Sequence, residues 1–251
     1  KETPRQLANA HTIFNIANSI IFLPFCTLYA SWVSRIIPIK TKPDYQAKYI
    51  HDMYLSDPVT ALQQTHLEIL HLTEFIQPAL ERLPDAIING DEKAASDIQT
   101  LYKKSNLIYL AIINYSRKLG ASNTDKRYSG QSEMLLSTAG YFFKIIEILN
   151  ESSTQMSDYV RSKKITVSPQ TREQFQELKN QVFESIDMAI ESLKSLDGRK
   201  AKKIIKQKKE IQNTANELNS YLHGRLLAED PSRTELYRLQ TEMVSIMQRI
   251  R

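Results

Sequence analysis

The stretch from Thr12 to Ser34 contains 23 residues without a charged side chain, and this limits what the chain can fold into. An α-helix needs roughly 20 mostly apolar residues to cross a hydrocarbon core about 30 Å thick. Tyr29 and Trp32 near its end suit an aromatic belt at a membrane interface. After it, apolar and charged positions alternate as they do in helices that face water. We therefore predict one membrane helix in front of one water-soluble helical domain.

The flanks of this stretch predict its context and orientation. The chain begins with Lys1, and the apolar run exceeds the roughly 7–15 residues of a signal peptide. We therefore expect the C-terminal part of a larger protein, starting just before its last membrane helix; a single-pass anchor is the alternative. Because cytoplasmic flanks are rich in basic residues, residues 41–251 are predicted to be cytoplasmic. Four basic residues follow the run: Arg35, Lys40, Lys42 and Lys48.

Composition narrows the class of protein. The single cysteine, Cys26, lies inside the apolar run, so a disulfide framework is excluded and a reducing compartment is indicated. Only six glycines occur in 251 residues, which favours an all-α chain. The net charge of +5 is too small to indicate nucleic-acid binding. A glycine-rich phosphate loop, a Ser/His/Asp order and paired catalytic carboxylates are missing from the sequence, so we do not expect an enzyme.

Helix starts are marked by proline preceded by a capping residue. The capping side chain accepts a hydrogen bond from a free N–H, and proline in the first turn has no N–H to satisfy. Pro78 is expected to kink the first helix near its end, and Asn89-Gly90-Asp91 is expected to form a turn. Three such starts are predicted: Asp57-Pro58, Ser168-Pro169 and Asp230-Pro231.

Apolar residues then recur at helical spacing along six segments, in two groups of three. Polar connections are predicted at 120–130 and 161–167, and a constant offset of 107 residues aligns 91–119 with 198–226, which indicates an internal duplication. We therefore expect an all-α fold of one transmembrane helix followed by two three-helix bundles. The expected divisions are a membrane segment at 1–40, a linker at 41–56, and repeats at 57–160 and 168–251.

Two motifs resemble the last membrane segment of the bacterial sodium–phosphate cotransporter family. The first runs from Arg5 through Ala8 and His11 to Asn15, in the pattern R-x-x-A-x-x-H-T-x-F-N, and the second is Leu23-Pro24-Phe25. Residues 50–251 resemble the PhoU-like domain that many of these transporters carry at the C-terminus, which also consists of two three-helix repeats.

The resemblance implies a regulatory domain of a sodium-dependent phosphate transporter in a bacterial inner membrane. The alternative is a membrane-anchored PhoU-type adaptor that regulates phosphate uptake through protein partners. Paired Gln-Ser-Ser repeats, which bind phosphate and co-transported sodium ion in this family, are missing here and are expected upstream. No cofactor is expected in this chain. Its bundle is a candidate surface for a homodimer or another protein partner.

The resemblance also bears on metals, because PhoU proteins often carry an acidic metal-binding motif on the third helix of each repeat. In the matching stretches only Glu147 and Glu242 keep a carboxylate. Because hard cations need several converging oxygens, we predict that the multinuclear metal site has been lost. The histidines of the soluble part lack the spacing of a metal site: His51, His66, His71 and His223.

Two further sets of residues are candidate contacts. His11 and Asn15 share one helical face at the membrane entrance, where they could line a transport path or form hydrogen bonds between helices. A basic helix face could meet anionic lipid or a phosphorylated partner, or could simply be solvated. It consists of Arg199, Lys202, Lys203, Lys206 and Lys209.

Overall fold

The computed structural model describes residues 47–122, 125–165, 167–196, 198–226 and 232–250, together with scattered positions between 11 and 25. Contacts divide the chain into two units, Lys1–Asp44 and Tyr45–Arg251. Within the described ranges every regular element is helical, as predicted. The elements are η1 (Asp52–Ser56), α2 (Pro58–Thr73), α3 (Ile76–Asn89), α4 (Glu92–Ser122), α5 (Lys126–Lys163), α6 (Pro169–Ser195), α7 (Gly198–Leu226) and α8 (Ser232–Ile250).

The predicted membrane helix at 12–34 lies largely outside the described residues. Those of its positions that the structure does describe are helical. In the described part of the chain, no helix combines the length and the apolar character needed to cross a bilayer. The transmembrane helix therefore remains a prediction.

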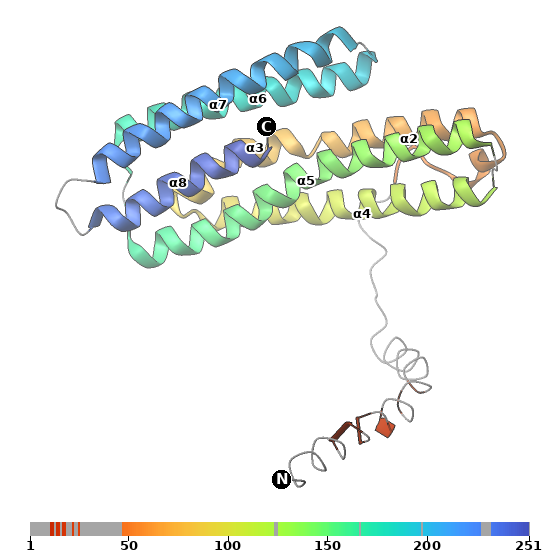
Figure 1. The fold of residues 1–251 in the computed structure, drawn as a ribbon, viewed down its shortest axis with the longest axis horizontal. Coiled ribbons are helices and arrows are strands. Elements are labelled where there is room, and N and C mark those ends of the chain that lie inside the picture. The colour runs from red at the N-terminus through yellow and green to blue at the C-terminus, as the bar shows by residue number, and fades with distance from the viewer. Residues whose placement is uncertain are drawn as a thin grey trace, which may run out of the picture. The chain divides into compact units, whose positions relative to one another are not determined.

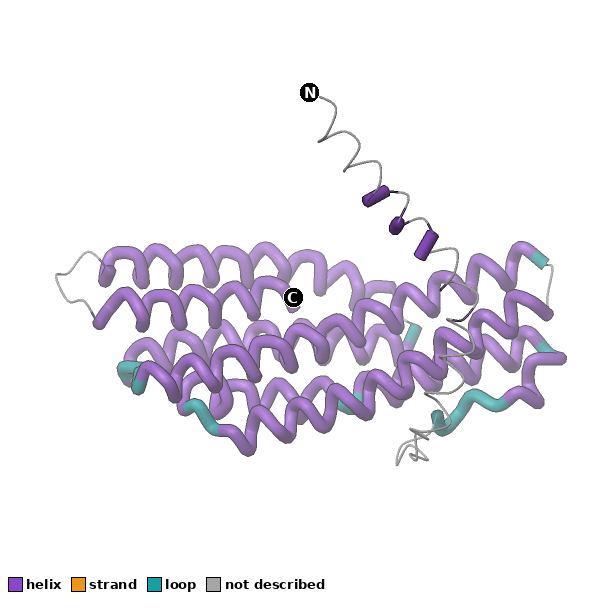
Figure 2. Tube along the Cα trace, turned by 90° about the horizontal axis from the view of Figure 1, so that it is seen from below, coloured by secondary structure: helices purple, strands orange, loops and turns teal. Residues whose placement is uncertain are grey.

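The first group of helices in the unit 45–251 contains α2, α3, α4 and α5. Helices α2 and α3 follow each other end to end, and both pack against the long helices α4 and α5 (Figure 1). The axes of these helices are roughly aligned with one another (Figure 2). The α2–α3 segment, α4 and α5 therefore pack mutually as a three-helix bundle whose first helix is broken, and η1 packs against α2 and α4.

The break between α2 and α3 corrects the predicted position of the kink. The first helix was expected to bend near Pro78 close to its end, but it stops at Thr73 and a helix of 14 residues follows. The cause is still Pro78, because proline lacks an N–H and its ring clashes with the carbonyl four residues earlier, that of Glu74. The helix is interrupted at Glu74 and Phe75, just where that carbonyl lies.

The predicted helix starts are confirmed where they are described. Asp57 accepts a hydrogen bond from the backbone N–H of Val59 at 3.2 Å, and Ser168 accepts one from Thr171 at 3.4 Å. The Asp230-Pro231 start lies outside the described residues. Gly90 ends α3 in the left-handed conformation at a φ of 67°, which only glycine adopts without strain.

Both predicted connections are shorter than expected. Helix α4 continues to Ser122, and α5 already begins at Lys126, because Asp125 accepts a hydrogen bond from the Arg127 N–H at 2.9 Å. Helix α5 then runs through the start of the second predicted connection and ends at Lys163. Extra turns at both ends make α5 the longest described helix, so it can contact elements of both groups.

The second group contains α6, α7 and α8. Helices α6 and α7 form a hairpin that lies along one side of the first group, and α8 packs between the hairpin and α5 (Figure 1). The core is continuous across both groups, so residues 45–251 form one compact unit with its own hydrophobic core. Its largest fully buried side chains are aliphatic and include Ile69, Leu72, Ile76, Leu80, Ile98, Ile108, Ile112, Ile146 and Leu149.

Candidate regulatory site

A buried carboxyl group holds the start of the unit 45–251 against α2. Glu68 is 0% exposed, and its Oε2 accepts hydrogen bonds from the backbone N–H groups of Lys48, Tyr49 and Ile50 at 2.8, 2.7 and 3.4 Å. Its Oε1 lies 2.8 Å from Nδ1 of His71. Burial of a carboxyl group is costly unless hydrogen bonds replace water, and here four donors do so. We call Glu68, His71 and residues 48–50 the linker clasp.

Two aromatic rings contact His71 of the linker clasp. The rings of Tyr49 and His71 meet edge to face with centroids 6.1 Å apart, and the ring centroids of His71 and Phe75 are 6.0 Å apart. Since Phe75 occupies the break between α2 and α3, the clasp connects the incoming chain directly to that break. The segment that follows the predicted membrane helix is therefore fixed to a discontinuity in the first group of helices.

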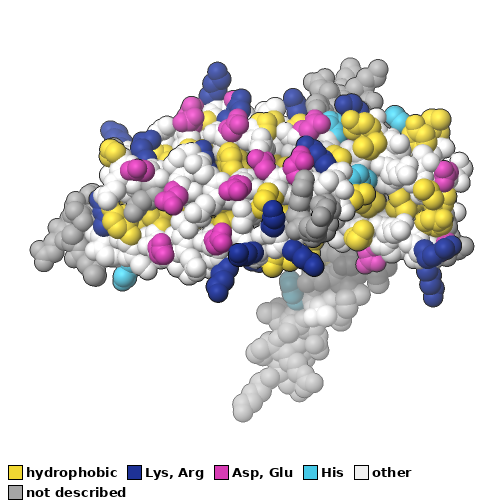
Figure 3. Space-filling model, turned by 90° about the horizontal axis from the view of Figure 1, so that it is seen from above, with side chains coloured by type: hydrophobic (Ala, Val, Ile, Leu, Met, Phe, Trp, Pro, Cys, Tyr) yellow, Lys and Arg dark blue, Asp and Glu magenta, His cyan; other side chains and the backbone are white. Residues whose placement is uncertain are grey.

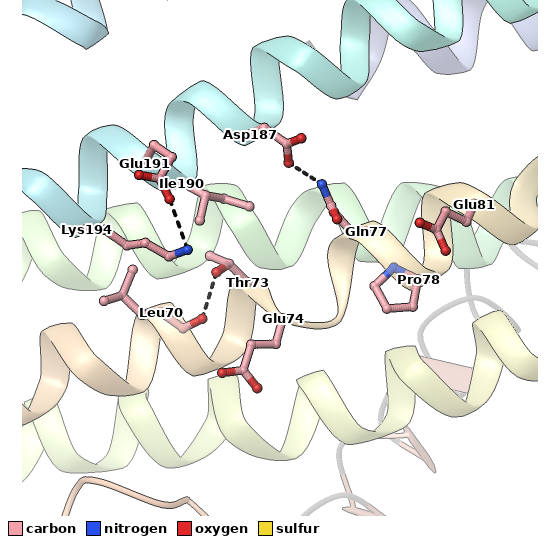
Figure 4. A pocket seen from close by; sticks show the side chains of 10 residues that line it. All are labelled: Leu70, Thr73, Glu74, Gln77, Pro78, Glu81, Asp187, Ile190, Glu191 and Lys194. Atoms are coloured by element: carbon pink, nitrogen blue, oxygen red, sulfur yellow. Dashed lines mark hydrogen bonds and ion pairs between the residues drawn. The ribbon is translucent and has the colours of Figure 1, made fainter.

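A groove of about 580 Å³ lies between this break and α6. Figure 4 shows Gln77 and Asp187 pointing toward each other across it, and they form a hydrogen bond from Gln77 Nε2 to Asp187 Oδ1. On the α6 side Lys194 pairs with Glu191 at 3.1 Å. The carboxylate of Glu74 points away from α6 in the same view. The carboxylates of the groove therefore do not converge on a common point.

His66, on α2 close to the C-terminal end of α6, has a pKa shifted by its surroundings. Burial lowers the pKa of His66 below its usual value of 6.5, while a hydrogen bond to the backbone of Leu193 opposes that shift. Leu193 belongs to α6, so His66 joins α2 to the far end of the α6–α7 hairpin. Together with the Gln77–Asp187 bond, it fixes the hairpin to the first group at two places.

At the other end of the hairpin the two groups are held by polar contacts to α5. Glu235 of α8 accepts a hydrogen bond from the Tyr159 hydroxyl and pairs with Lys163 at 3.1 Å. The Tyr159 hydroxyl, followed by Lys163, lowers the pKa of Glu235. Arg249 lies 3.8 Å from Glu151 further along the same interface.

The predicted membrane-entrance pair lies in the unit 1–44. His11 and Asn15 are both helical and exposed. Their predicted role in transport or helix contacts is not tested by this arrangement, and it stays a prediction.

The predicted basic face is exposed on α7. Lys202, Lys203, Lys206 and Lys209 all lie in solvent, and the backbone of Arg199 lies in the first turn of the same helix. Figure 3 looks onto the side that α6 and α7 cover and shows Lys and Arg side chains there, interspersed with Asp and Glu. The opposite side of the helix is apolar, with Ile211, Ala215, Leu218 and Leu222 buried.

The two residual carboxylates of the predicted metal motifs lie on different helices, Glu147 on α5 and Glu242 on α8. Glu147 pairs with Lys144 at 2.6 Å, one turn away on α5. Glu242 is half-buried on α8. Among the described residues, no three His, Cys, Asp or Glu side chains are grouped so that they could hold a metal ion. The loss of the metal site stays a prediction.

Sequence reasoning missed the linker clasp. Glu68 lies on the buried side of α2, three residues after Thr65 and four before Leu72, and all three are buried. A charged residue on the buried side of an amphipathic helix was the available signal, because such a residue needs a partner. The partner could not be identified in advance, since it consists of backbone N–H groups.

Comparison with protein families matches residues 175–250 to the PhoU domain. Comparison with curated proteins and with solved structures gave no match. The matched range covers nearly all of α6, α7 and α8, the second group of helices. The predicted resemblance to PhoU is therefore confirmed for this range, and the predicted relation to sodium–phosphate cotransporters remains to be tested.

Proposed function

We propose that residues 45–251 are a PhoU-type regulatory domain of a sodium-dependent phosphate transporter in a bacterial inner membrane. In this proposal the upstream membrane domain binds phosphate and sodium, and residues 41–251 lie in the cytoplasm and control uptake. The observation that carries the proposal is the PhoU match on a helical unit that follows a predicted membrane helix. The PhoU domain is a regulatory, non-catalytic helical family, which supports control rather than catalysis.

The linker clasp supports a physical route for this control. A free linker would transmit little, because a flexible chain decouples the segments at its ends. Here the three amides of residues 48–50 are held by Glu68, and Phe75 at the break of α2 and α3 contacts the clasp. A rearrangement at the break would thus move the chain that leads toward the membrane.

A second candidate function is an anchored adaptor, in which the apolar segment only tethers the domain. The basic face on α7 favours this candidate, because its described lysines are exposed and offer an anionic partner a positively charged surface. The two functions differ in whether the parent protein transports phosphate.

The test is sodium-dependent uptake of labelled phosphate into vesicles by the full-length parent protein and by a version truncated after Lys40. Uptake by both proteins, at a different rate in the truncated one, is the expected result. An absence of sodium-dependent uptake in both, with the proteins verified in the membrane, would reject the transporter and favour the adaptor.

A further inference from the structure

The tip of the α6–α7 hairpin carries a cluster of exposed lysines. Lys202, Lys203, Lys206 and Lys209 occupy the first turns of α7 and are exposed. Within the described part of the chain none of the four makes an ion pair or a side-chain hydrogen bond, whereas Lys194 at the end of α6 pairs with Glu191. Like charges this close repel one another, so the cluster costs stability unless something outside the unit binds it.

Two large aliphatic side chains are exposed at the same place. Ile205 is 72% exposed between Lys202 and Lys209, and Leu196 is 77% exposed at the end of α6. An exposed isoleucine among lysines gains no contact on a helix face that is surrounded by water. On a helix that lies in a membrane interface, the same side chain is buried, because apolar side chains enter the boundary between headgroups and acyl chains. Lysine stems can also lie along such a boundary with the ammonium group in the headgroup region.

The shape of the surface distinguishes between lipid and a phosphorylated partner. Phosphate groups on proteins are recognised by arginine forks that bind two oxygens at once. The described side chains of this face are lysines on the convex outside of a helix, and the nearest described cavities are lined by other elements or by the opposite side of α7. Point charges spread over a convex surface fit a diffuse layer of anionic headgroups better than a single phosphate.

The position of the tip also suits a membrane. Leu196 borders a cavity that is lined by Leu62, His66 and Leu67 of α2, and the linker clasp holds the incoming chain on the same helix. If the predicted membrane helix ends at Ser34, twelve residues (35–46) separate it from Ala47. A chain of this length spans at most about 45 Å when fully extended, so Ala47, next to residues 48–50 of the linker clasp, would lie within that distance of the end of such a membrane helix.

We propose that the basic tip of α7 (Lys202, Lys203, Ile205, Lys206 and Lys209), together with Leu196, binds the anionic surface of the membrane. The lysines lie among the headgroups, and Ile205 and Leu196 enter the interface. This inference shares with the proposed function only the predicted membrane attachment. It requires neither phosphate transport nor regulation of uptake.

The test measures binding of residues 45–251, which contain the complete hydrophobic core, to lipid vesicles by co-sedimentation. Vesicles of phosphatidylcholine alone are compared with vesicles in which about one third of the lipid is phosphatidylglycerol. Binding to the anionic vesicles only, and weakening of that binding as salt is added, is the expected result. Equal binding to both kinds of vesicle, or no binding, overturns the proposal.

Variants identify the surface. Each lysine near an anionic membrane contributes about fivefold in affinity, so Lys202→Gln/Lys206→Gln should bind about 25-fold more weakly. The matched control is Lys93→Gln/Lys103→Gln, which removes the same charge from exposed positions of α4 and should bind like the wild type. Equal losses in both double variants would mean that net charge alone drives binding and would overturn the proposal.

Two further measurements complete the test. Ile205→Ser should weaken binding to anionic vesicles without changing its salt dependence, because it removes only the apolar contact; an unchanged affinity would contradict insertion. A fluorescent peptide with two phosphoserines serves as the competing probe. Tight binding of that peptide, lost in Lys202→Gln/Lys206→Gln, together with no vesicle binding would assign the face to a phosphorylated partner and overturn the proposal. Since vesicle binding and phosphate uptake are separate readouts, either proposal can fail alone.

Discussion

Glu68 and His71 are both buried on α2, one helical turn apart, with Oε1 and Nδ1 2.8 Å from each other. Because His71 occupies one carboxyl oxygen, the other is left to accept the three backbone N–H groups of residues 48–50. The pair therefore holds residues 48–50 against α2 at the start of the helical unit.

Removal of the carboxyl group should release this segment. Glu68→Ala leaves His71 and three backbone N–H groups without their acceptor, so we expect the free energy of unfolding of residues 45–251 to fall by about 2–4 kcal/mol. Amide hydrogen exchange at Lys48, Tyr49 and Ile50 should accelerate more than exchange in the middle of α4. The control Glu81→Ala changes an exposed residue of α3 and should stay within about 0.5 kcal/mol of the wild type. Unchanged exchange at the three amides would contradict the clasp.

Gly90 should resist substitution, whereas Gly120 should not. An alanine at position 90 would have to adopt a φ of 67°. Its Cβ would lie 3.4 Å from Val160 Cγ1 and 3.5 Å from the Ser157 carbonyl oxygen. We expect Gly90→Ala to lower the free energy of unfolding by about 1–2 kcal/mol. Gly120→Ala, in helix α4 with open space around it, should raise that free energy by up to about 1 kcal/mol. Chemical denaturation measures both, and a stabilised Gly90→Ala would show that the turn is wrongly described.

His66 should make the stability of the unit depend on pH. Burial holds the pKa of His66 below 6.5 in the folded chain, so the unfolded chain binds more protons between the two pKa values. The contribution of neutral His66 is complete above about pH 6.5 and is lost as the pH falls through its folded pKa. The free energy of unfolding should therefore drop more on acidification in the wild type than in His66→Gln. Parallel pH curves for the two proteins would refute this role.

Metal content tests the predicted loss of the multinuclear site. With Glu147 paired to Lys144 and no suitable grouping among the described residues, residues 45–251 should retain no stoichiometric iron or zinc after dialysis. Elemental analysis of the purified unit measures this. One or more iron or zinc ions per chain that survive dialysis would overturn the prediction.

The sequence predicted most of the helical pattern, because local signals determine it. The pairs Asp57-Pro58 and Ser168-Pro169 mark helix starts through capping, and Gly90 marks a turn through its left-handed conformation. The apolar side of α7 follows from its spacing alone. Helix lengths were harder to predict from the sequence. Helix α5 extends at both ends through residues whose composition is typical of connections, but which form its first and last turns.

The candidate site was much harder to predict. The basic face on α7 was visible as a charge run, because exposure on a helix follows from its period. The linker clasp was not, because it joins Glu68 to backbone amides about twenty residues earlier in the chain. The groove between the break and α6 needed the packing of two groups whose residues, Gln77 and Asp187, are more than a hundred positions apart. Such pairings depend on tertiary packing, which no local pattern encodes.

The most direct measurement is the response of phosphate uptake to phosphate inside the vesicles. The initial rate of sodium-driven uptake is measured at rising internal phosphate for the full-length parent protein and for the version truncated after Lys40. If residues 41–251 regulate transport, internal phosphate changes the rate of the full-length protein but not that of the truncated one. The same dependence in both proteins would contradict a regulatory role for this domain.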